Sequence, residues 1–124
     1  MLSKEKKLFE ELREIIKEMN EEVDVVIVEG VKDRNALRKL GFKKDIINYR
    51  EKGRFELLEK VKEKYQRVVV LTDFDRQGKK YNKEISDFLK NRVDKRYREK
   101  IGKILCSNGR RDIESINNLI KKFG

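Results

Sequence analysis

The sequence of 124 residues contains no histidine, no proline, no tryptophan and a single cysteine, Cys106. One cysteine excludes an intramolecular disulfide and a zinc site built from cysteines. Without histidine, catalysis by a serine–histidine pair and metal sites with histidine ligands are excluded as well. Any metal ion must therefore be bound by oxygen atoms, which points to Mg²⁺ or Mn²⁺ as the cofactor.

Long apolar runs are also missing from the chain. No stretch approaches the roughly 20 apolar residues that a membrane helix needs, and the charged N-terminal segment contains no apolar stretch of signal-peptide length. We therefore expect a cytoplasmic protein without a membrane partner. The length, and the absence of any long linker, predict a single domain over residues 1–124.

Charge, in contrast, is abundant. Charged residues make up 45% of the chain, mostly lysine and glutamate, a composition typical of proteins from hot environments. The net charge of +10 favours a polyanionic partner, and we expect nucleic acid. The alternative is a lysine-rich surface that serves solubility alone. The most basic stretch, residues 90–100, contributes three candidates for phosphate contacts, Lys95, Arg96 and Arg98.

Helical and strand patterns alternate along the chain. Apolar residues at helical spacing predict amphipathic helices, and short β-branched runs predict buried strands. This alternation favours an α/β fold of three layers, in which a central parallel sheet of about four strands lies between helices. The expected helices span about 4–19, 34–40, 54–65, 77–92 and 112–122, and the expected strands about 24–28, 46–49, 68–71 and 101–106.

Two of the expected strands end in acidic residues. Glu29 follows the strand at 24–28, and Asp73 and Asp75 follow the strand at 68–71. If these strands are neighbours, the three carboxylates converge at the edge of the sheet where α/β folds bind ligands. Carboxylates about 4 Å apart repel by on the order of 4 kcal/mol at an effective dielectric constant of 20, so such a cluster requires a cation or a proton. The alternative interpretation is that these acids only cap the helices that follow.

Further charged residues lie near the strand ends and are weaker candidates. Arg76, Arg110 and Arg111 flank strand ends and are candidates for phosphate contacts. Asp33 and Asp112 fit helix N-caps, although Asp33 could instead support the metal ligands, and Asp112 and Glu114 could also lie near the site. Together with Glu114, Asp112 also suits the first turn of a helix, where an acid stabilises the helix dipole.

These motifs together resemble the Toprim domain over about residues 22–107. The resemblance rests on Glu29-Gly30 after a first strand, on Asp33-x-x-Ala36-Leu37 with Leu40-Gly41 a few residues later, and on Thr72-Asp73-x-Asp75-x-x-Gly78. Topoisomerases, bacterial-type primases, overcoming-lysogenisation nucleases, recombination mediators and the ribonuclease that matures the smallest ribosomal RNA share this domain. The resemblance implies a Mg²⁺ site formed by Glu29, Asp73 and Asp75, with the glutamate as general acid/base and the aspartates as metal ligands.

Within this family the chain is most similar to the stand-alone, small primase-like proteins. It shows neither the domain that carries a topoisomerase's catalytic tyrosine nor a primase's zinc-binding module. The resemblance implies metal-dependent cleavage of phosphodiester bonds, with RNA slightly ahead of DNA. Two alternatives stay open: a non-catalytic nucleic-acid-binding module that works with a protein partner or as a homo-oligomer, and primase-like nucleotidyl transfer.

Two other families with aspartate-containing sites fit the sequence less well. A response-regulator receiver would have a pair of aspartates after its first strand, where this chain has Glu29 and Gly30. A haloacid-dehalogenase-type phosphatase would have threonine or valine at the position of Gln77.

Overall fold

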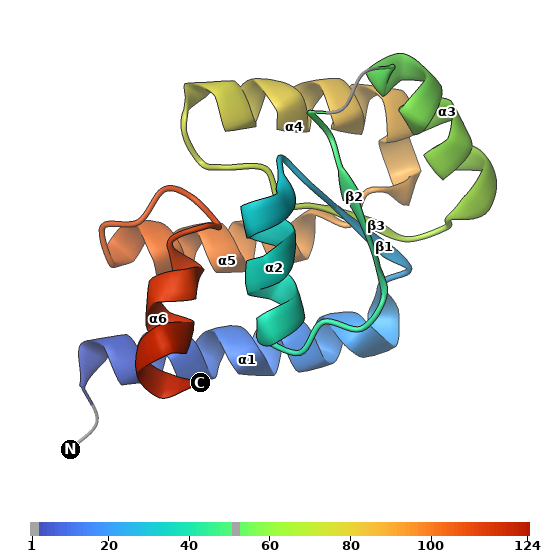
Figure 1. Ribbon diagram of the computed structural model, residues 1–124. Helices are drawn as coiled ribbons and strands as arrows, with labels where there is room; N and C mark the ends of the chain where they lie inside the picture. The colour runs from blue at the N-terminus through green and yellow to red at the C-terminus, as the bar shows by residue number, and fades with distance from the viewer. Residues whose placement is uncertain (1–2, 51–52) are drawn as a thin grey trace.

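The computed structural model describes residues 3–50 and 53–124 and has three layers (Figure 1). The central sheet is parallel, in the order β2-β1-β3. One face of it is covered by two helices and the other by four, which confirms the predicted α/β class and the N-terminal helix. Residues 1–2 and 51–52 of the predicted domain lie outside the described part. The elements are α1 (Lys4–Glu22), β1 (Val25–Val28), α2 (Val31–Lys39), β2 (Asp45–Asn48), α3 (Arg54–Lys64), β3 (Val68–Val70), α4 (Arg76–Leu89), the 3₁₀ turn η1 (Lys90–Arg92), α5 (Lys95–Ser107) and α6 (Ile116–Phe123).

Strand β1 is central and buried on both faces. Its side chains alternate between the two cores: Val26 and Val28 pack with α1, α2, α5 and α6, whereas Val25 and Ile27 pack with α3 and α4. A strand in this position requires apolar side chains in every place, and the run of four β-branched residues supplies them. This is why the sequence predicts the strand within one residue of its observed start.

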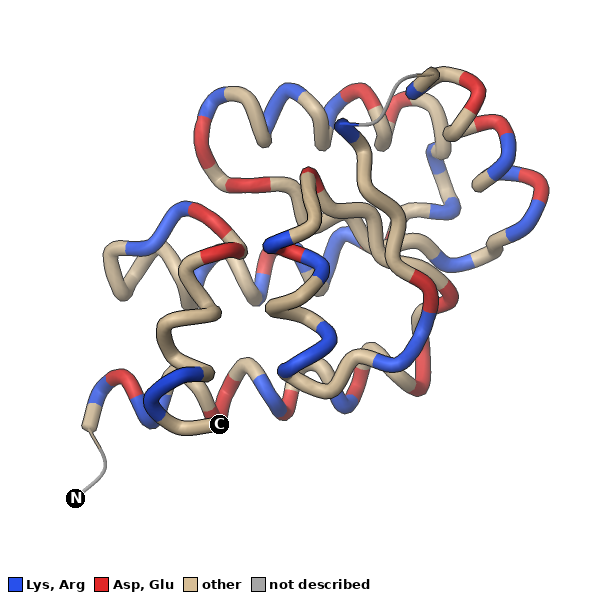
Figure 2. Tube along the Cα trace, viewed as in Figure 1, with Lys and Arg blue, Asp and Glu red and all other residues tan. Residues whose placement is uncertain are grey.

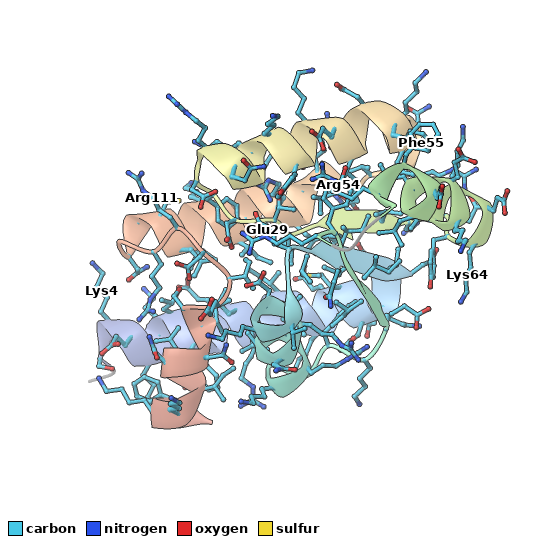
Figure 3. All side chains as sticks on the ribbon, turned by 45° about the horizontal axis from the view of Figure 1, so that its top comes forward. Lys4, Glu29, Arg54, Phe55, Lys64 and Arg111 are labelled. Carbon is cyan, nitrogen blue, oxygen red and sulfur yellow. The ribbon has the colours of Figure 1, made fainter. Side chains whose placement is uncertain are left out.

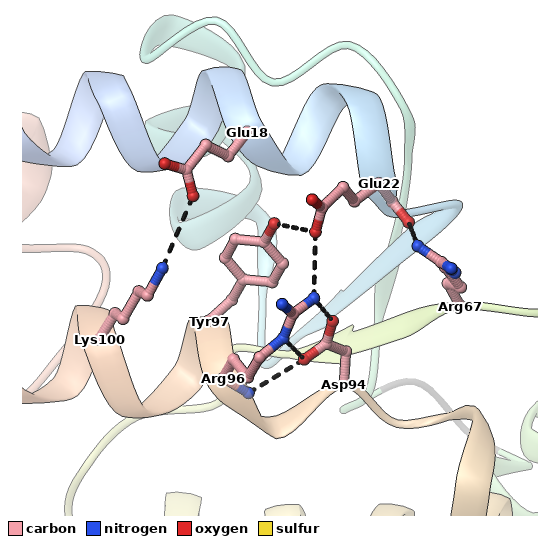
Figure 4. Close-up of polar contacts among 7 residues, drawn as sticks. All are labelled: Glu18, Glu22, Arg67, Asp94, Arg96, Tyr97 and Lys100. Atoms are coloured by element: carbon pink, nitrogen blue, oxygen red, sulfur yellow. Dashed lines mark hydrogen bonds and ion pairs between the residues drawn. The ribbon is translucent and has the colours of Figure 1, made fainter.

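Helix α1 lies along one side of the molecule and begins after Ser3, whose side chain accepts a hydrogen bond from the N–H of Lys6. It continues to Glu22, three residues beyond the predicted end. The last turn is tied to the start of α5 (Figure 4): the hydroxyl of Tyr97 donates to Glu22 Oε2 at 2.6 Å, and Arg96 Nη2 donates to the same oxygen at 3.0 Å. These contacts fix α5 against α1 at the N-terminal end of the strands.

The predicted strand at 101–106 is wrong, because these residues lie in α5. Tyr97, Ile101 and Leu105 are buried at a spacing of four residues, which is the period of a helix face packed on the sheet. Taken alone, the short apolar run is compatible with either structure. The sheet therefore has three strands, and the described residues extend it beyond β3 only by a single parallel bridge between Val68 and Val93.

The two aspartates predicted as helix N-caps lie elsewhere in their helices. Helix α2 starts at Val31 with Gly30 as its N-cap, and Asp33 sits in the first turn, where its carboxylate accepts the N–H of Gly30 at 3.1 Å. The last helix starts at Ile116. Asp112 instead accepts the N–H of Ser115 at 2.7 Å, in the turn that precedes the helix. Both carboxylates therefore accept hydrogen bonds from backbone N–H groups close to a helix start. Neither residue is itself the N-cap, and each lies a few residues from the observed N-cap.

Positively and negatively charged residues are interspersed along the chain, and both kinds occur on most of the helices (Figure 2). None of the helices within residues 3–50 and 53–124 combines the length and the apolar character that crossing a membrane requires. The net charge of +10 is therefore spread over the surface. Whether a given lysine or arginine is available for a ligand depends on whether an acidic side chain already pairs with it.

Candidate functional site

The acidic residues that follow β1 and β3 meet at the carboxyl edge of the sheet. The two strands are parallel neighbours, with Ile27 opposite Val70, so the chain leaves both of them on the same side. Glu29 Oε1 accepts a hydrogen bond from the backbone N–H of Asp73 at 3.0 Å. The structure therefore brings Glu29 and Asp73 into direct contact, although 44 positions separate them.

Glu29 is a buried carboxylate with both oxygens in use. Only 2% of it is exposed, and it lies in the middle of the molecule, above the sheet (Figure 3). Its second oxygen, Oε2, pairs with Arg50 Nη2 at 3.1 Å. Arg50 itself is 63% exposed, so it supplies the counter-charge from the solvent side. A buried carboxylate needs such a partner, because burial without one is costly.

Asp73 is half-buried beside Glu29. Its Oδ1 accepts the backbone N–H of Ile113 at 3.1 Å, and in the described part of the chain Oδ2 accepts no hydrogen bond. The pKa of Asp73 is raised to about 7, mainly by burial and also by the negative charges of Glu29, Asp33 and Asp75, while the hydrogen bond from Ile113 acts in the opposite direction. In this position the negatively charged form of Asp73 is therefore unfavourable unless a cation lies nearby.

Glu29 and Asp73 line a pocket with a volume of about 240 Å³, and two further acids line it as well. Asp33 comes from the first turn of α2 and Glu114 from the turn before α6. Burial, aided by the charges of Glu29 and Glu114, raises the pKa of Asp33 to about 6. For both residues the sequence favours a local role at a helix start, with a position near the site as the weaker alternative. Nothing in the local sequence shows that those helix starts face Glu29, because that depends on how α2 and α6 pack.

Asp75 lies outside this pocket and caps α4. Its Oδ1 accepts the N–H of Gly78 at 2.8 Å, so the helix-capping interpretation describes what this oxygen does. Within residues 3–50 and 53–124, no three acidic side chains lie together in an arrangement that holds a metal ion. The three predicted ligands thus divide into a contacting pair, Glu29 and Asp73, and a third acid at the start of α4.

The first turn of α4 is pressed against the backbone of Asp73. A Cβ atom at Gly78 would lie only 1.9 Å from the carbonyl oxygen of Asp73. The buried hydroxyl of Thr72 donates to the carbonyl of Gly78 at 2.6 Å and fixes the same approach. At this position the backbone can come so close only because glycine has no side chain. Gly30 differs, because a Cβ there would meet no atom within 4 Å.

The donor atoms of the pocket suit a hard divalent cation. They are carboxylate oxygens from Glu29, Asp33, Asp73 and Glu114, with no sulfur or imidazole among them. Mg²⁺ is commonly bound by one or two carboxylates and keeps water or phosphate oxygens as its other ligands. The unpaired Oδ2 of Asp73, beside Glu29, is the oxygen that would hold such an ion. Asp33 and Glu114 add negative charge around it.

The six predicted phosphate-binding residues fall into two groups. Arg76, Lys95 and Arg111 are exposed, and in the described part of the chain none of them has an ion-pair partner. The other three are engaged within the protein: Arg96 by Asp94 and Glu22, Arg110 by Glu5 and the carbonyl of Ser115, and Arg98 by backbone carbonyls after β3.

Arg50 was absent from the predicted site, although the sequence held a signal for it. It lies two residues after β2, at the same edge of the sheet as the acids, and its N–H donates to the carbonyl of Glu29 at 3.3 Å. The strand predicted at 46–49 already places a basic residue at that edge. A search for cations at every strand end, rather than for acids alone, would have found it.

A second, larger cleft adjoins the acidic pocket. It has a volume of about 540 Å³, lies between α2 and α6, and shares Lys32 and Glu114 with the pocket. These two residues form an ion pair at 3.4 Å at the junction. Lys39 and Lys121 also line the cleft, as do several amide side chains. A polar, partly cationic channel therefore leads away from the carboxylates.

Comparison with known proteins agrees with this geometry. The family model described as "Toprim domain" matches residues 24–106. A UPF0292 protein of Thermococcus sibiricus is 35% identical over 116 residues, covering 90% of this chain and 86% of its own. A UPF0292 protein of Methanocaldococcus jannaschii is 33% identical, covering 92% and 93%. Neither name states an activity. A solved structure of an Aquifex aeolicus protein has a TM-score of 0.65 and 25% identity, covering 89% of this chain and 95% of its own.

Proposed function

Because the chain belongs to the Toprim domain family, we propose that it is a Mg²⁺-dependent enzyme that cleaves phosphodiester bonds in nucleic acid. The observation that carries the proposal is the pocket of four carboxylates where β1 and β3 end. Membership of the family supports a metal-dependent role connected with nucleic acid. RNA is placed ahead of DNA because the small proteins that the sequence resembles are similar to a ribonuclease.

In this proposal each residue has a role that follows from its position. Asp73 and Glu29 would hold the metal, whose positive charge stabilises the charge that builds up on the phosphate when it is bound. Glu29 Oε2, now paired with Arg50, is the atom that would accept or return a proton. Arg50 is mostly exposed, so its guanidinium can turn from Glu29 towards a phosphate. Asp75 would contribute a further metal ligand through its Oδ2 atom, because its Oδ1 atom caps α4.

The cleft between α2 and α6 offers a path for the nucleic acid strand. It opens from the acidic pocket at Lys32, and its other lysines, Lys39 and Lys121, come from the two helices on either side. Phosphates that follow the cleft would meet lysine and amide groups before they reach the carboxylates. Such contacts fix the position of a strand without reading its sequence.

The proposal is tested by a cleavage assay with structured RNA, single-stranded DNA and duplex DNA. We expect cutting with Mg²⁺ or Mn²⁺ and none with a chelator. Cutting that is unchanged by the chelator would contradict the metal-dependent mechanism. Intact substrates under every condition, despite measurable binding, would favour the second candidate function.

That second candidate is a nucleic-acid-binding module without catalysis, and one observation favours it. Both oxygens of Glu29 are already engaged, by the N–H of Asp73 and by Arg50, while Asp75 caps a helix. In this arrangement the acids stabilise the fold. Binding would then depend on the surface cations, and metal would change stability without giving cleavage.

Replacing both Arg76 and Arg111 with glutamine is expected to weaken nucleic acid binding and to reduce its dependence on salt. Each phosphate contact that is lost lowers the slope of log K against log salt by about 0.7 to 0.9, so two contacts lower it by roughly 1.4 to 1.8. The measurement is fluorescence anisotropy with a single-stranded oligonucleotide across a salt series.

The matched control is the pair Arg96→Gln and Arg110→Gln, which removes the same charge from side chains already held by carboxylates. We expect this pair to change the slope by less than half as much. Equal slopes for the two double variants would show that binding depends on net charge alone and not on the cations near the acidic pocket.

A further inference from the structure

A third cavity, separate from the acidic pocket and from the cleft between α2 and α6, lies between α4 and α5. Its volume is about 320 Å³, and most of its lining is apolar. Ligand pockets span about 300 to 1,000 Å³, so this one is sized for a small group. Its apolar lining comes from Val70, Phe74, Val93 and Gly102, and polar and charged side chains, among them Asn82 and Arg98, complete it.

The cavity contains an arginine that is fixed in place. Arg98 Nη1 donates to the carbonyl of Thr72 at 2.6 Å, and Nη2 donates to the carbonyl of Asp73 at 3.0 Å. Burial lowers the pKa of Arg98, while the charges of Asp73 and Glu29 act in the opposite direction. Its guanidinium is therefore a rigid wall of the cavity rather than a mobile surface cation.

Phe74 is held against this guanidinium. The distance from Arg98 Cζ to the centre of the Phe74 ring is 4.6 Å, which is the range of a cation–π contact. The ring also lies against α5 at Gly102, where a Cβ would come within 2.7 Å of its Cε1 atom. Phe74 and Arg98 thus form an ordered pair of flat groups inside an apolar cavity.

The cavity and the acidic pocket lie on two sides of one peptide segment. Arg98 binds the carbonyl oxygen of Asp73, whose carboxylate faces the acidic pocket. Phe74 follows Asp73 in the chain, and its N–H donates to the carbonyl of Arg111 at 2.7 Å. The adjacent residues Asp73 and Phe74 therefore line the acidic pocket and the cavity, respectively.

We propose that this cavity binds one unpaired nucleobase of the nucleic acid strand that is held at the acidic pocket. Flat aromatic and guanidinium groups are the surfaces on which unstacked bases are recognised. Lys95 and Lys103 lie at the lining, where they can meet phosphates on either side of the base, and Asn82 and Glu99 offer hydrogen bonds to its edge. The inference rests on the proposed function only in requiring that a strand binds.

The test measures anisotropy with oligonucleotides in which one position at a time lacks its base, without divalent metal so that the strand stays intact. Stacking on an aromatic side chain contributes about 1–3 kcal/mol per base, which corresponds to roughly 5- to 150-fold in affinity. We expect the wild-type protein to lose at least about 5-fold at one position and little elsewhere. In Phe74→Leu, the intact and the base-free strand should bind equally.

The control for this variant is Phe55→Leu, the same change at a ring that is 64% exposed on α3 and remote from the cavity. It should keep the wild-type discrimination. Should Phe74→Leu fail to fold, Asn82→Phe fills the cavity from α4, and Asn91→Phe is its exposed control. Equal binding of the intact and every base-free strand by the wild type would overturn the inference and leave the proposed function standing. No binding of any strand, either without metal or with it, would overturn both.

Discussion

Replacing Asp73 with asparagine is expected to lower metal-dependent cleavage by at least about 100-fold and, at the same time, to make the metal-free protein more stable. Asparagine has the shape of aspartate and keeps an oxygen for the N–H of Ile113. It removes the negative charge that lies beside Glu29 and Asp33. A ligand that suits Mg²⁺ is thereby lost, and so is the repulsion that the ligand causes in the absence of metal.

The expected gain in the free energy of unfolding is on the order of 1 kcal/mol at pH 8 without metal. At that pH the carboxyl group of Asp73, whose pKa is about 7, carries its charge in the folded protein. Thermal melting with and without Mg²⁺ checks both parts of the prediction. Wild type should melt higher when Mg²⁺ is added, and Asp73→Asn should show the same melting temperature in both conditions.

Asp24→Asn is the matched control, because Asp24 accepts the N–H groups of Gln66 and Arg67 at the opposite end of the sheet. It should leave cleavage unchanged. Glu29→Gln is a less clean test: its amide nitrogen would face either the N–H of Asp73 or Arg50, and both are donors. An Asp73→Asn protein that cuts at the wild-type rate would remove Asp73 from the mechanism.

Gly78→Ala is expected to be the most disruptive single methyl group in the described chain. Its Cβ would overlap the carbonyl oxygen of Asp73 at 1.9 Å and the carbonyl carbon at 2.5 Å. Both atoms belong to the backbone, so no side chain can turn away and α4 has to move. Overpacking of this kind typically costs about 1–3 kcal/mol and occasionally more, and we expect a loss of at least about 3 kcal/mol here.

Chemical denaturation measures this loss, and Gly30→Ala provides the comparison. Gly30 has an extended backbone, with a φ of −156°, and a Cβ there would meet no atom within 4 Å. Alanine at this position meets no clash and should therefore cost only about 1 kcal/mol or less, the loss expected when alanine replaces glycine as an N-cap. Both glycines follow a strand and its acids in the sequence, Gly30 directly after Glu29 and Gly78 three residues after Asp75, and they would then differ sharply in effect. Similar losses at both positions would contradict this account of Gly78.

The sequence was sufficient for the sheet strands that are buried on both faces. In β1 and β3 every residue is a β-branched apolar one, and such short runs leave few other interpretations once polar residues follow. The helix at 95–107 was missed because Tyr97, its first buried residue, falls in a stretch dominated by basic residues. Without Tyr97, the four-residue period of the apolar face was not apparent.

The candidate site was predictable to the extent that strand order was predictable. Parallel neighbours bring Glu29 and Asp73 to one edge, and the paired strand ends in the sequence indicate this. Arg50 and Glu114 reach the same pocket through β2 and the turn before α6. The approach of Glu114 depends on packing between distant segments, which no local pattern reports, whereas Arg50 follows a predicted strand end and could have been found there. Asp75 shows the reverse case, where a local role, capping α4, competes with the role that its motif suggests.

The hydrogen bond from the N–H of Ile113 to Asp73 Oδ1 couples the site to the segment between α5 and α6. Amide exchange with solvent proceeds through local openings whose free energies are smaller than that of global unfolding. Each opening that exposes the Ile113 amide also releases the carboxylate of Asp73, while the buried strands keep their hydrogen bonds. The fraction of molecules with an ordered site therefore depends on the opening equilibrium of the turn that contains Ile113. Even when the sheet is intact, Asp73 is not held in place in the molecules in which this turn is open.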